Sequence, residues 1–363
     1  MKRVIVCNTY YQLIFSIQLK FTLFCSEEIY LVLTDHSSNA EGVVENLKKM
    51  AVFKDVFYVK TRDLDYSKLG LKTLIPSVMP GVFGNSSIFK NVVKIYIDEL
   101  IYFNLSYSTV HLFAALNKKN PDLKCSRMEE GVLSYNSTCN DGMDLGVRKT
   151  LIAKFRTFLK LDNAFERVEN FYCFQPDFYK GALKPVKVPP IASNGRVKDV
   201  LLKIFNVNLE EDSYKEKYIF FTSVYDFEGG TPIGEYELVC KIADLVGKEN
   251  LLVKTHPRDL RTIYTDNGFK TDKNSGVPWE AIQLSRDFSD KVFLTATSGS
   301  VLAGSFMSEN PPKTFFMHNC CNISGNKSAE KSVEIIEELL NDDGLKDSLK
   351  TVKIAKEIKD ISN

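Results

Sequence analysis

A cluster of cationic and hydrogen-bonding side chains follows the short apolar run Leu251 to Val253. The run is typical of a buried strand, and Pro257 ends it because proline has no amide hydrogen and disfavours a helical conformation at the residue before it. We therefore expect His256 at the carboxyl end of a strand, where open α/β sheets bind their ligands. Histidine can donate a proton or hold an anion near neutral pH. Lys254 and Arg258 alongside it favour a phosphate-bearing ligand; the alternative is a surface turn that contains a histidine by chance.

A second anion-binding segment is predicted after the strand expected at 291–294. Thr297, Ser298, Gly299 and Ser300 supply hydroxyls and backbone amides at the expected start of a helix over 301–307. Such a start can bind phosphate through unpaired N–H groups and the helix dipole. The alternative is simple capping of the helix by one of the serines. Two strand ends of this kind in one half of the chain support a phosphate site better than either does alone.

Paired carboxylates offer a candidate general base. Glu129 and Glu130 precede Gly131 at a chain reversal, and two nearby like charges raise one pKa toward the range that suits a base. An exposed acidic turn is the alternative. Asp226 and Glu228 form another acidic pair in a glycine-containing loop. That loop follows the strand expected at 218–222, whose end also offers two hydroxyls for phosphate or sugar binding, those of Thr222 and Ser223.

No metal site or cofactor is expected. Asp63 and Asp65 match the D-x-D pattern of metal-dependent transferases of another fold, but they lie in an irregular segment without supporting ligands. The sequence contains no GxGxxG, P-loop or GxSxG pattern. Eight scattered cysteines without a CxxC pair indicate reduced thiols rather than zinc ligands or disulfides. Cys7, at a strand end, is expected to be a buried small apolar residue.

The elements expected around these residues alternate between strand and helix in both halves of the chain. In the first half we expect strands at 3–7, 29–33, 56–59 and 109–114, helices at 10–24, 43–51, 89–103 and 147–161, an irregular segment at 62–88 and an extended one at 165–174. In the second half we expect strands at 218–222, 251–253, 291–294 and 314–317, and helices at 198–205, 234–246, 279–284, 301–307, 333–340 and 345–361. This alternation is the signature of parallel sheets covered by helices.

Two domains are predicted from the length of 363 residues and from a proline- and glycine-rich stretch near the middle. The predicted boundaries are an N-terminal, acceptor-side Rossmann-like domain at 1–180, a linker at 181–197, a nucleotide-sugar-binding Rossmann-like domain at 198–345 and a C-terminal helix at 346–363. Two such α/β domains, with parallel sheets that face a central cleft, are the outline of a GT-B glycosyltransferase. Fold analogy alone does not establish function.

Charge and hydropathy indicate which partners and which cellular location to expect. The formal net charge of +1 gives no indication of nucleic-acid binding. No run reaches the ~18 apolar residues of a membrane span, and the N-terminus lacks a convincing signal-peptide cleavage site. We therefore expect a cytoplasmic protein. The lysine-rich helix expected at the C-terminus could rest on an anionic inner membrane, or pack on the protein body with its lysines in solvent.

Four segments resemble a known family. Val4 to Leu13 is similar to the opening of bacterial sialyltransferases of glycosyltransferase family 52. Glu129-Glu130-Gly131 resembles the acidic-acidic-glycine motif shared by families 38, 52 and 80, and His256-Pro257 resembles their His-Pro motif. Thr297 to Ser300 approximates their paired Ser/Thr motif, although Gly299 separates the two serines. The order and wide spacing of the motifs agree with the family, and the resemblance covers nearly the whole chain.

The resemblance implies an inverting, metal-independent sialyltransferase that moves sialic acid from CMP-sialic acid to a hydroxyl of a bacterial surface glycan, either lipooligosaccharide or capsule. His256 would be the general acid or phosphate ligand, and Glu130 would be the base, with Asp226 as second candidate. The donor side would contain Ser298, Gly299, Ser300, Thr222, Ser223 and Lys254. The acceptor side would contain Asn8, Thr9, Gln12, Glu129 and Gly131.

Other functions stay open. The same fold could serve a polysialyltransferase, another nucleotide-dependent glycosyl or glycerol-phosphate transferase, or a non-catalytic protein that binds nucleotides or glycans. The carboxylates that accompany the His-Pro and serine-rich segments argue mildly against the non-catalytic alternative. The sequence does not define the acceptor, the linkage or the oligomeric state, so a homodimer is also open.

Overall fold

The computed structural model describes residues 1–37, 39–66, 71–135, 146–191, 195–207, 214–228, 230–272, 277–308 and 310–362. Within them the chain forms two compact units. Unit 1 comprises residues 1–189 and 199–204, and unit 2 comprises residues 190–198 and 205–363. The boundary between the units passes through α8 (Gly195–Ile204), which lies in the region predicted as the linker and the start of the second domain.

Unit 1 is built on a seven-stranded sheet in which every neighbouring pair of strands is parallel. The strand order is β3-β2-β1-β4-β5-β6-β7. The strands are β1 (Lys2–Cys7), β2 (Glu28–Thr34), β3 (Asp55–Val59), β4 (Glu99–Tyr102), β5 (Lys124–Met128), β6 (Val168–Cys173) and β7 (Lys184–Lys187). The order reverses between β1 and β4, and this switch point is where doubly wound sheets open a crevice for ligands.

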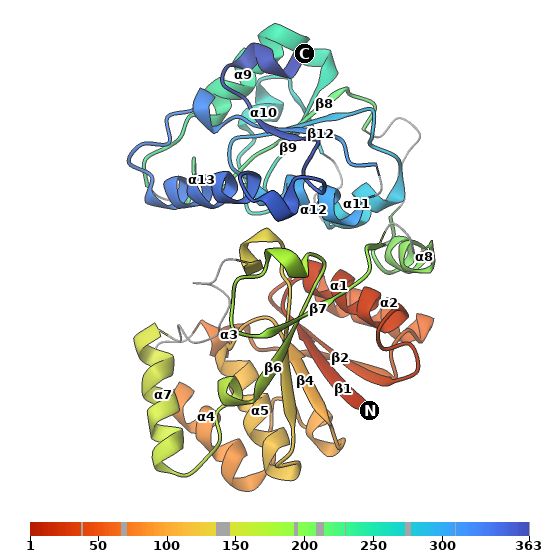
Figure 1. The fold of residues 1–363 in the computed structure, drawn as a ribbon, viewed down its shortest axis with the longest axis vertical. Helices are drawn as coiled ribbons and strands as arrows, with labels where there is room; N and C mark the ends of the chain where they lie inside the picture. Colours follow the sequence, from red (N-terminus) through yellow and green to blue (C-terminus); the bar gives the residue numbers. More distant parts are fainter. Residues whose placement is uncertain are drawn as a thin grey trace. The chain divides into compact units, whose positions relative to one another are not determined.

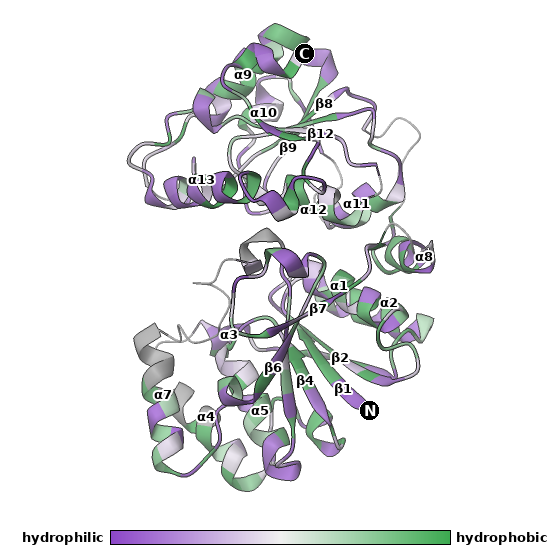
Figure 2. Ribbon diagram, viewed as in Figure 1, coloured by the Kyte–Doolittle hydropathy of each residue, from purple (hydrophilic) through white to green (hydrophobic). Residues whose placement is uncertain are grey.

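Helices cover both faces of this sheet. Helices α1 (Tyr10–Phe21) and α2 (Ala40–Met50) lie on one side, and α4 (Leu71–Phe83), α5 (Tyr107–Lys119) and α7 (Gly146–Phe158) lie on the other (Figure 1). A short helix, α3 (Arg62–Asp65), precedes α4. The central strands bury almost every side chain, and Figure 2 shows their hydrophobic colouring along β1 and β2. Strands that helices cover on both faces read as continuous apolar runs, which explains why β1 and β2 were predictable.

Unit 2 contains a six-stranded sheet, again with every neighbouring pair parallel. Its order is β10-β9-β8-β11-β12-β13, so its switch point lies between β8 and β11. The strands are β8 (Tyr218–Phe221), β9 (Leu251–Lys254), β10 (Lys270–Thr271), β11 (Val292–Thr295), β12 (Lys313–Phe316) and β13 (Val352–Ile354). The helices are α9 (Glu235–Val246), α10 (Ile263–Asp266), α11 (Trp279–Ser285), α12 (Ala303–Met307) and α13 (Lys327–Leu340).

The predicted α/β class with two parallel sheets is confirmed, but several elements were predicted wrongly. Residues 109–114, predicted as a strand, belong to helix α5, and residues 89–103, predicted as a helix, contain strand β4. Helix α5 is buried on nearly all sides, so it lacks the polar face that distinguishes a helix from a strand in a sequence. Residues 62–88 contain α3 and α4 rather than an irregular excursion, and the predicted linker contains β7.

The C-terminal segment is also not the predicted helix. Residues 346–362 contain strand β13, which pairs with β12 and completes the sheet, followed by a 3₁₀ turn at Ile358–Ser362. The lysine-rich amphipathic helix proposed there is therefore wrong. None of the helices in the described ranges combines the length and the hydrophobicity that a membrane span needs.

Candidate functional site

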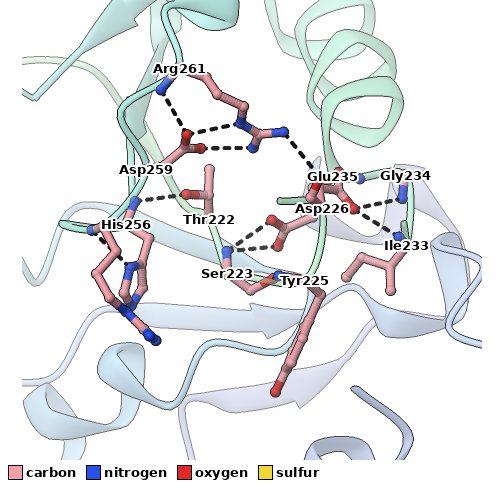
Figure 3. Close-up of polar contacts among 11 residues, drawn as sticks. Thr222, Ser223, Tyr225, Asp226, Ile233, Gly234, Glu235, His256, Asp259 and Arg261 are labelled. Carbon is pink, nitrogen blue, oxygen red and sulfur yellow. Dashed lines mark hydrogen bonds and ion pairs between the residues drawn. The ribbon is translucent and has the colours of Figure 1, made fainter. Parts of the chain in front are cut away.

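The carboxyl end of β9 bears His256, as predicted. Pro257 and Arg258 occupy the centre of a turn that the Asp259 N–H closes by donating to the His256 carbonyl oxygen at 2.8 Å. The backbone N–H of His256 donates to Thr222 Oγ1, 2.8 Å away at the end of β8 (Figure 3). The turn therefore holds His256 against the neighbouring strand end, beside the switch point of the sheet.

The imidazole of His256 has a defined hydrogen-bond arrangement. Its Nδ1 accepts a hydrogen bond from the Arg258 N–H at 3.2 Å, so the neutral ring carries its proton on Nε2. Burial and the positive charges of Arg258 and Lys254 lower the pKa of His256, against an opposing effect of Glu228. The residue is partly exposed. Its Nε2–H has no hydrogen-bond partner among the residues that the structure describes. A neutral imidazole of this kind at the carboxyl end of a strand can donate a hydrogen bond to an anion.

Asp226 does not project as a free base. Its carboxylate accepts three backbone hydrogen bonds at the start of α9, from the N–H groups of Ile233 at 2.8 Å, Gly234 at 3.2 Å and Glu235 at 2.9 Å (Figure 3). The Glu235 N–H is one of the groups that an isolated helix start leaves without a partner. Asp226 therefore stabilises the start of α9, and its carbonyl oxygen also accepts a hydrogen bond from Arg261 at 3.2 Å.

Two polar residues that the sequence did not single out support this edge of unit 2. Glu235 is buried, and both of its carboxylate oxygens accept the Ser223 N–H, at 3.0 and 2.8 Å. Burial raises its pKa to about 8. Arg261 forms a two-pronged ion pair with Asp259, at 2.9 and 2.8 Å, which braces the turn after His256. A glutamate in the first turn of a helix reads only as a favourable helix-dipole charge, so its buried position was not evident.

The serine-rich segment follows β11 on the other side of the switch point. Ser298 Oγ and Ser300 Oγ lie 2.8 Å apart, and the Ser298 N–H donates to Thr295 Oγ1 at 2.8 Å. Residues Gly299–Leu302 form a 3₁₀ turn before the five-residue helix α12, so the expected helix over 301–307 begins later than predicted. A Cβ atom built on Gly299 would meet nothing within 4 Å. Thr297 Oγ1 is buried and has no hydrogen-bond partner among the residues that the structure describes.

Lys254, predicted as a phosphate ligand, has another partner in the structure. Its ammonium group is buried and forms an ion pair with Asp272 at 3.0 Å. It also lies 5.7 Å from the centre of the Trp279 ring. This ion pair is buried inside unit 2, whereas Thr222, Ser223 and His256 follow the carboxyl ends of β8 and β9.

In unit 1 the predicted acceptor-side residues come together at the carboxyl ends of β1 and β5. Gln12 Nε2 donates to Glu130 Oε2 at 2.7 Å, and Gln12 Oε1 accepts the Asn8 N–H at 2.6 Å. Thr9 caps α1 by accepting the Gln12 N–H at 3.3 Å. Burial raises the pKa of Glu130, although the hydrogen bonds from Thr9 and Gln12 lower it in part. Gly131 has a φ of +69°, which suits glycine, and allows the chain to turn after the two carboxylates.

Glu129 is fully buried and held by aromatic residues. It accepts hydrogen bonds from Tyr11 Oη at 2.5 Å, from Tyr135 Oη and from the Phe174 N–H at 2.8 Å. Burial raises its pKa to about 7. Glu129 therefore has a structural role, because its hydrogen bonds link Tyr11, Tyr135 and Phe174. Glu130 is the member of the pair that is partly exposed. Tyr135 and Phe174 were missed because neither carries a sequence motif.

Two further sequence predictions concern metals and thiols. Asp65 of the D-x-D pair accepts hydrogen bonds from the Ser108 N–H and hydroxyl, both at 2.8 Å, and lies 3.0 Å from His36 Nε2. It thus has a structural role at the start of α5. Among the described residues, no group of three or more His, Cys, Asp or Glu could hold a metal ion. Burial raises the pKa of Cys7 to about 12, which agrees with a buried apolar role.

Comparisons with known structures agree with the fold. The alpha/beta-galactoside alpha-2,3-sialyltransferase of Photobacterium phosphoreum matches with a TM-score of 0.52 and 12% identity over 99% of this chain and 98% of that chain. A UDP-N-acetylglucosamine 2-epimerase from Listeria monocytogenes matches at 0.47, with 10% identity over 93% and 88% of the two chains. The wall teichoic acid polymerase TagF matches at 0.43, with 12% identity over 96% and 86%. The likeness to the sialyltransferase confirms the GT-B type of fold.

Sequence comparison identifies the family. No curated protein sequence matches the chain significantly. The specific resemblance to family 52 stays a prediction. Residues 3–288, however, match the model of the alpha-2,8-polysialyltransferase family (POLYST). This match includes both strand ends of unit 1 that bear the candidate site, as well as His256. The chain is therefore a glycosyltransferase that belongs to the alpha-2,8-polysialyltransferase family.

Proposed function

We propose that the protein transfers sialic acid from CMP-sialic acid to a hydroxyl of a bacterial surface glycan, with inversion at the anomeric carbon and without a metal. Membership of the alpha-2,8-polysialyltransferase family favours an acceptor that already ends in sialic acid, so that repeated transfer builds a polymer. A lipooligosaccharide or a capsular polysaccharide would be such an acceptor.

The observation that carries the proposal is the arrangement of His256. The Arg258 N–H occupies Nδ1, and Nε2–H remains the donor of the neutral ring at the carboxyl end of β9. CMP is a leaving group with a single phosphate, so it needs a compact anion site and a proton or hydrogen-bond donor. In the proposal His256 Nε2 donates to the departing phosphate. Hydrogen-bond donors aimed at developing charge typically contribute about 10²–10³-fold each to turnover.

The remaining donor contacts come from the two strand ends at the switch point. Ser298 and Ser300 lie within hydrogen-bond distance of each other, so one phosphate oxygen could accept from both. The open space beside Gly299 lets a ligand approach the backbone closely. Thr222 holds the His256 backbone, and we assign it a positioning role together with Ser223. Because the Lys254 ammonium is paired with Asp272, the proposal assigns no ligand contact to it.

On the acceptor side, we propose that Glu130 is the general base. The acceptor hydroxyl attacks the anomeric carbon of the donor, the bond from this carbon to the phosphate oxygen breaks, and the hydroxyl proton passes to Glu130. Its raised pKa and partial exposure suit this role. Asp226, the second candidate, already accepts three backbone hydrogen bonds, which supports Glu130 as the base. Gln12 orients the carboxylate, and Asn8, Thr9, Glu129 and Gly131 shape its surroundings.

The test is thermal stabilisation by CMP, CDP, UDP and GDP. A nucleotide that binds the folded state at a hundred times its Kd stabilises it by roughly 2.7 kcal/mol. We expect CMP to raise the melting temperature of the wild type and not of His256→Ala. Leu260→Ala is the matched control, because Leu260 is 90% exposed in the same loop. Stabilisation by UDP or GDP in place of CMP would rule out sialyl transfer from CMP-sialic acid.

A second measurement addresses polymerisation. Mass spectrometry of the products from a sialylated oligosaccharide and CMP-sialic acid should show a ladder of successive additions. A single addition that does not continue under excess donor would exclude the polymerising activity and leave single sialyl transfer.

A further inference from the structure

Large exposed apolar side chains are concentrated on two helices of unit 1. Eight of the fourteen on the described surface lie on α4, on α7 or directly after α7. On α4 they are Ile75, Met79, Val82 and Phe83; on and after α7 they are Leu151, Phe155, Phe158 and Leu159. We call these eight residues the α4–α7 face. Phe158 is 80% exposed, and Phe83 is 61% exposed. Isolated exposed apolar residues are ordinary, whereas a gathered set marks an interaction surface.

The same spacing occurs in both helices. The exposed residues follow positions i, i+4, i+7 and i+8, which places each set on one stripe of a helix. Other positions of each helix are already used for packing. In α4, Val78 and Gly81 are buried, and in α7 Arg156 is buried and lies 5.9 Å from the centre of the Phe113 ring of α5. Each helix is thus apolar on an outer stripe that the fold does not cover.

The two stripes belong to one region of unit 1. Helices α4 and α7 contact each other, and they lie side by side in Figure 1. A Cβ atom built on Gly81 would lie 3.3 Å from Leu161 Cδ1, so the chain that follows α7 comes close to α4. The two stripes therefore lie on neighbouring helices of unit 1, and we treat them as one area.

Exposed lysines lie close to these stripes along the chain. Segments 71–94 and 146–161 contain lysine and arginine but no aspartate or glutamate. Lys154 and Lys160 are exposed next to the α7 stripe, and Lys90 and Lys94 are exposed in the chain that follows α4. Lys118, also exposed, approaches the end of α4 at Gly84. The nearest following acid, Asp162, forms an ion pair with Arg167 at 2.8 Å.

We propose that the α4–α7 face docks on the surface of an anionic phospholipid bilayer. The apolar stripes would enter the boundary between headgroups and acyl chains, and the lysines would contact the negative headgroups. Charge argues against a second copy of this chain, because a symmetric contact would place one basic rim against another. This inference is independent of the proposed chemistry, and it places membrane contact on unit 1 rather than on the C-terminal segment.

The experiment is flotation of the full-length protein with vesicles of two compositions. One set contains phosphatidylglycerol and phosphatidylethanolamine, and the other contains phosphatidylcholine alone. We expect binding to the anionic vesicles at least about tenfold stronger than to the neutral ones, with loss of part of the binding at high salt. The double variant Phe83→Glu/Phe158→Glu should reduce binding to anionic vesicles at least about tenfold. Lys154→Glu/Lys160→Glu should reduce it as well and should weaken its salt dependence.

A matched control uses exposed leucines of unit 2. Leu245→Glu/Leu260→Glu introduces the same two charges at exposed apolar positions outside the face, and it should bind as the wild type does. All variants should keep the wild-type melting temperature and the wild-type turnover of a soluble acceptor. Wild-type vesicle binding by the Phe83/Phe158 variant would overturn the proposal, as would equal binding to both vesicle types. A dimer in light scattering that only this variant dissociates would assign the face to a second copy instead.

Discussion

In both units the candidate polar residues lie at the carboxyl ends of parallel strands, but different kinds of hydrogen bond hold them in place. In unit 1, Tyr11 and Gln12 reach Glu129 and Glu130 across 118 positions of sequence, through side-chain hydrogen bonds. In unit 2, the backbone supplies most of the donors, and Asp226 binds N–H groups only seven to nine residues away. The site of unit 1 thus depends on tertiary packing of side chains, whereas that of unit 2 depends mainly on local turns.

This difference separates the two candidate roles. The carboxylates of unit 1 lie in buried surroundings that raise the pKa of both Glu129 and Glu130, which makes Glu130 a better proton acceptor. The surroundings of His256 in unit 2 lower its pKa, which favours a neutral ring that donates a hydrogen bond through Nε2. The carboxylates of unit 1 are suited to accept a proton, and His256 of unit 2 is suited to stabilise an anion.

The largest expected effect is that of Glu130→Gln. Glutamine keeps the size of the side chain and can still bond with Gln12, but it cannot accept the acceptor proton. We expect kcat to fall by about 10²–10⁴-fold, with little change in melting temperature. Glu169→Gln is a suitable control, because Glu169 is exposed and paired with Lys124 at 3.1 Å. Steady-state kinetics with CMP-sialic acid measures the effect. A loss of less than tenfold would exclude Glu130 as the base.

The pH profile sharpens the same prediction. A general base must be deprotonated, so wild-type kcat/KM should fall as pH decreases through the pKa of Glu130. Burial raises this pKa, so the fall should occur at a higher pH than for an ordinary glutamate, whose pKa is about 4.3. A profile that stays flat down to pH 4.5 would contradict the assignment.

A smaller effect is expected on stability, from the buried carboxylate of Glu235. Its pKa rises from 4.5 to about 8 in the folded state because of burial, so the folded state favours the protonated form. Stability from this group is therefore fully present below pH 4.5 and is lost as pH rises through 8. We expect the free energy of unfolding to fall by roughly 2–4 kcal/mol between pH 5 and pH 8 from this residue. Denaturant titrations at several pH values measure it.

Glu235→Gln provides the comparison for that prediction. Glutamine retains an oxygen to accept the Ser223 N–H but does not ionise. Its stability should therefore depend less on pH over this range than that of the wild type. Parallel curves for the two proteins would show that Glu235 does not titrate between pH 5 and pH 8.

Much of the architecture was predictable because local patterns define it. The strands that end at Cys7, Phe221 and Thr295 are apolar runs followed by polar residues, and Pro257 ends the run before His256. Buried helices were harder. The sequence of α5 contains β-branched and aromatic residues without a polar face, because α4 and the sheet pack against it, and it resembles a strand. The C-terminal strand β13 was missed because its three residues form no apolar run, and its pairing with β12 is a long-range contact.

The candidate site was predictable in its members but not in its contacts. Glu129 and Glu130 could be selected as a carboxylate pair, but the partner residue Tyr135 carries no pattern that announces it. Asp226 was the second candidate for the base because it lies ahead of the His-Pro motif, after a strand end. Its actual contacts depend on a loop that returns to the start of α9, and such a return is not visible in residue types.

The smallest expected effect concerns Asp226, the candidate base in unit 2 that competes with Glu130 of unit 1. If Asp226 stabilises the start of α9, Asp226→Asn should cost about 1–2 kcal/mol of stability, because one of its two acceptor oxygens becomes a donor group facing backbone N–H. Turnover per folded molecule should stay within a few-fold of the wild type. Asp290→Asn is the control, since Asp290 is exposed and forms an ion pair with its neighbour Lys291 at 3.2 Å. A loss of turnover beyond 10²-fold with unchanged stability would reverse the comparison: Asp226 would be the base, and Glu130 would be a structural carboxylate.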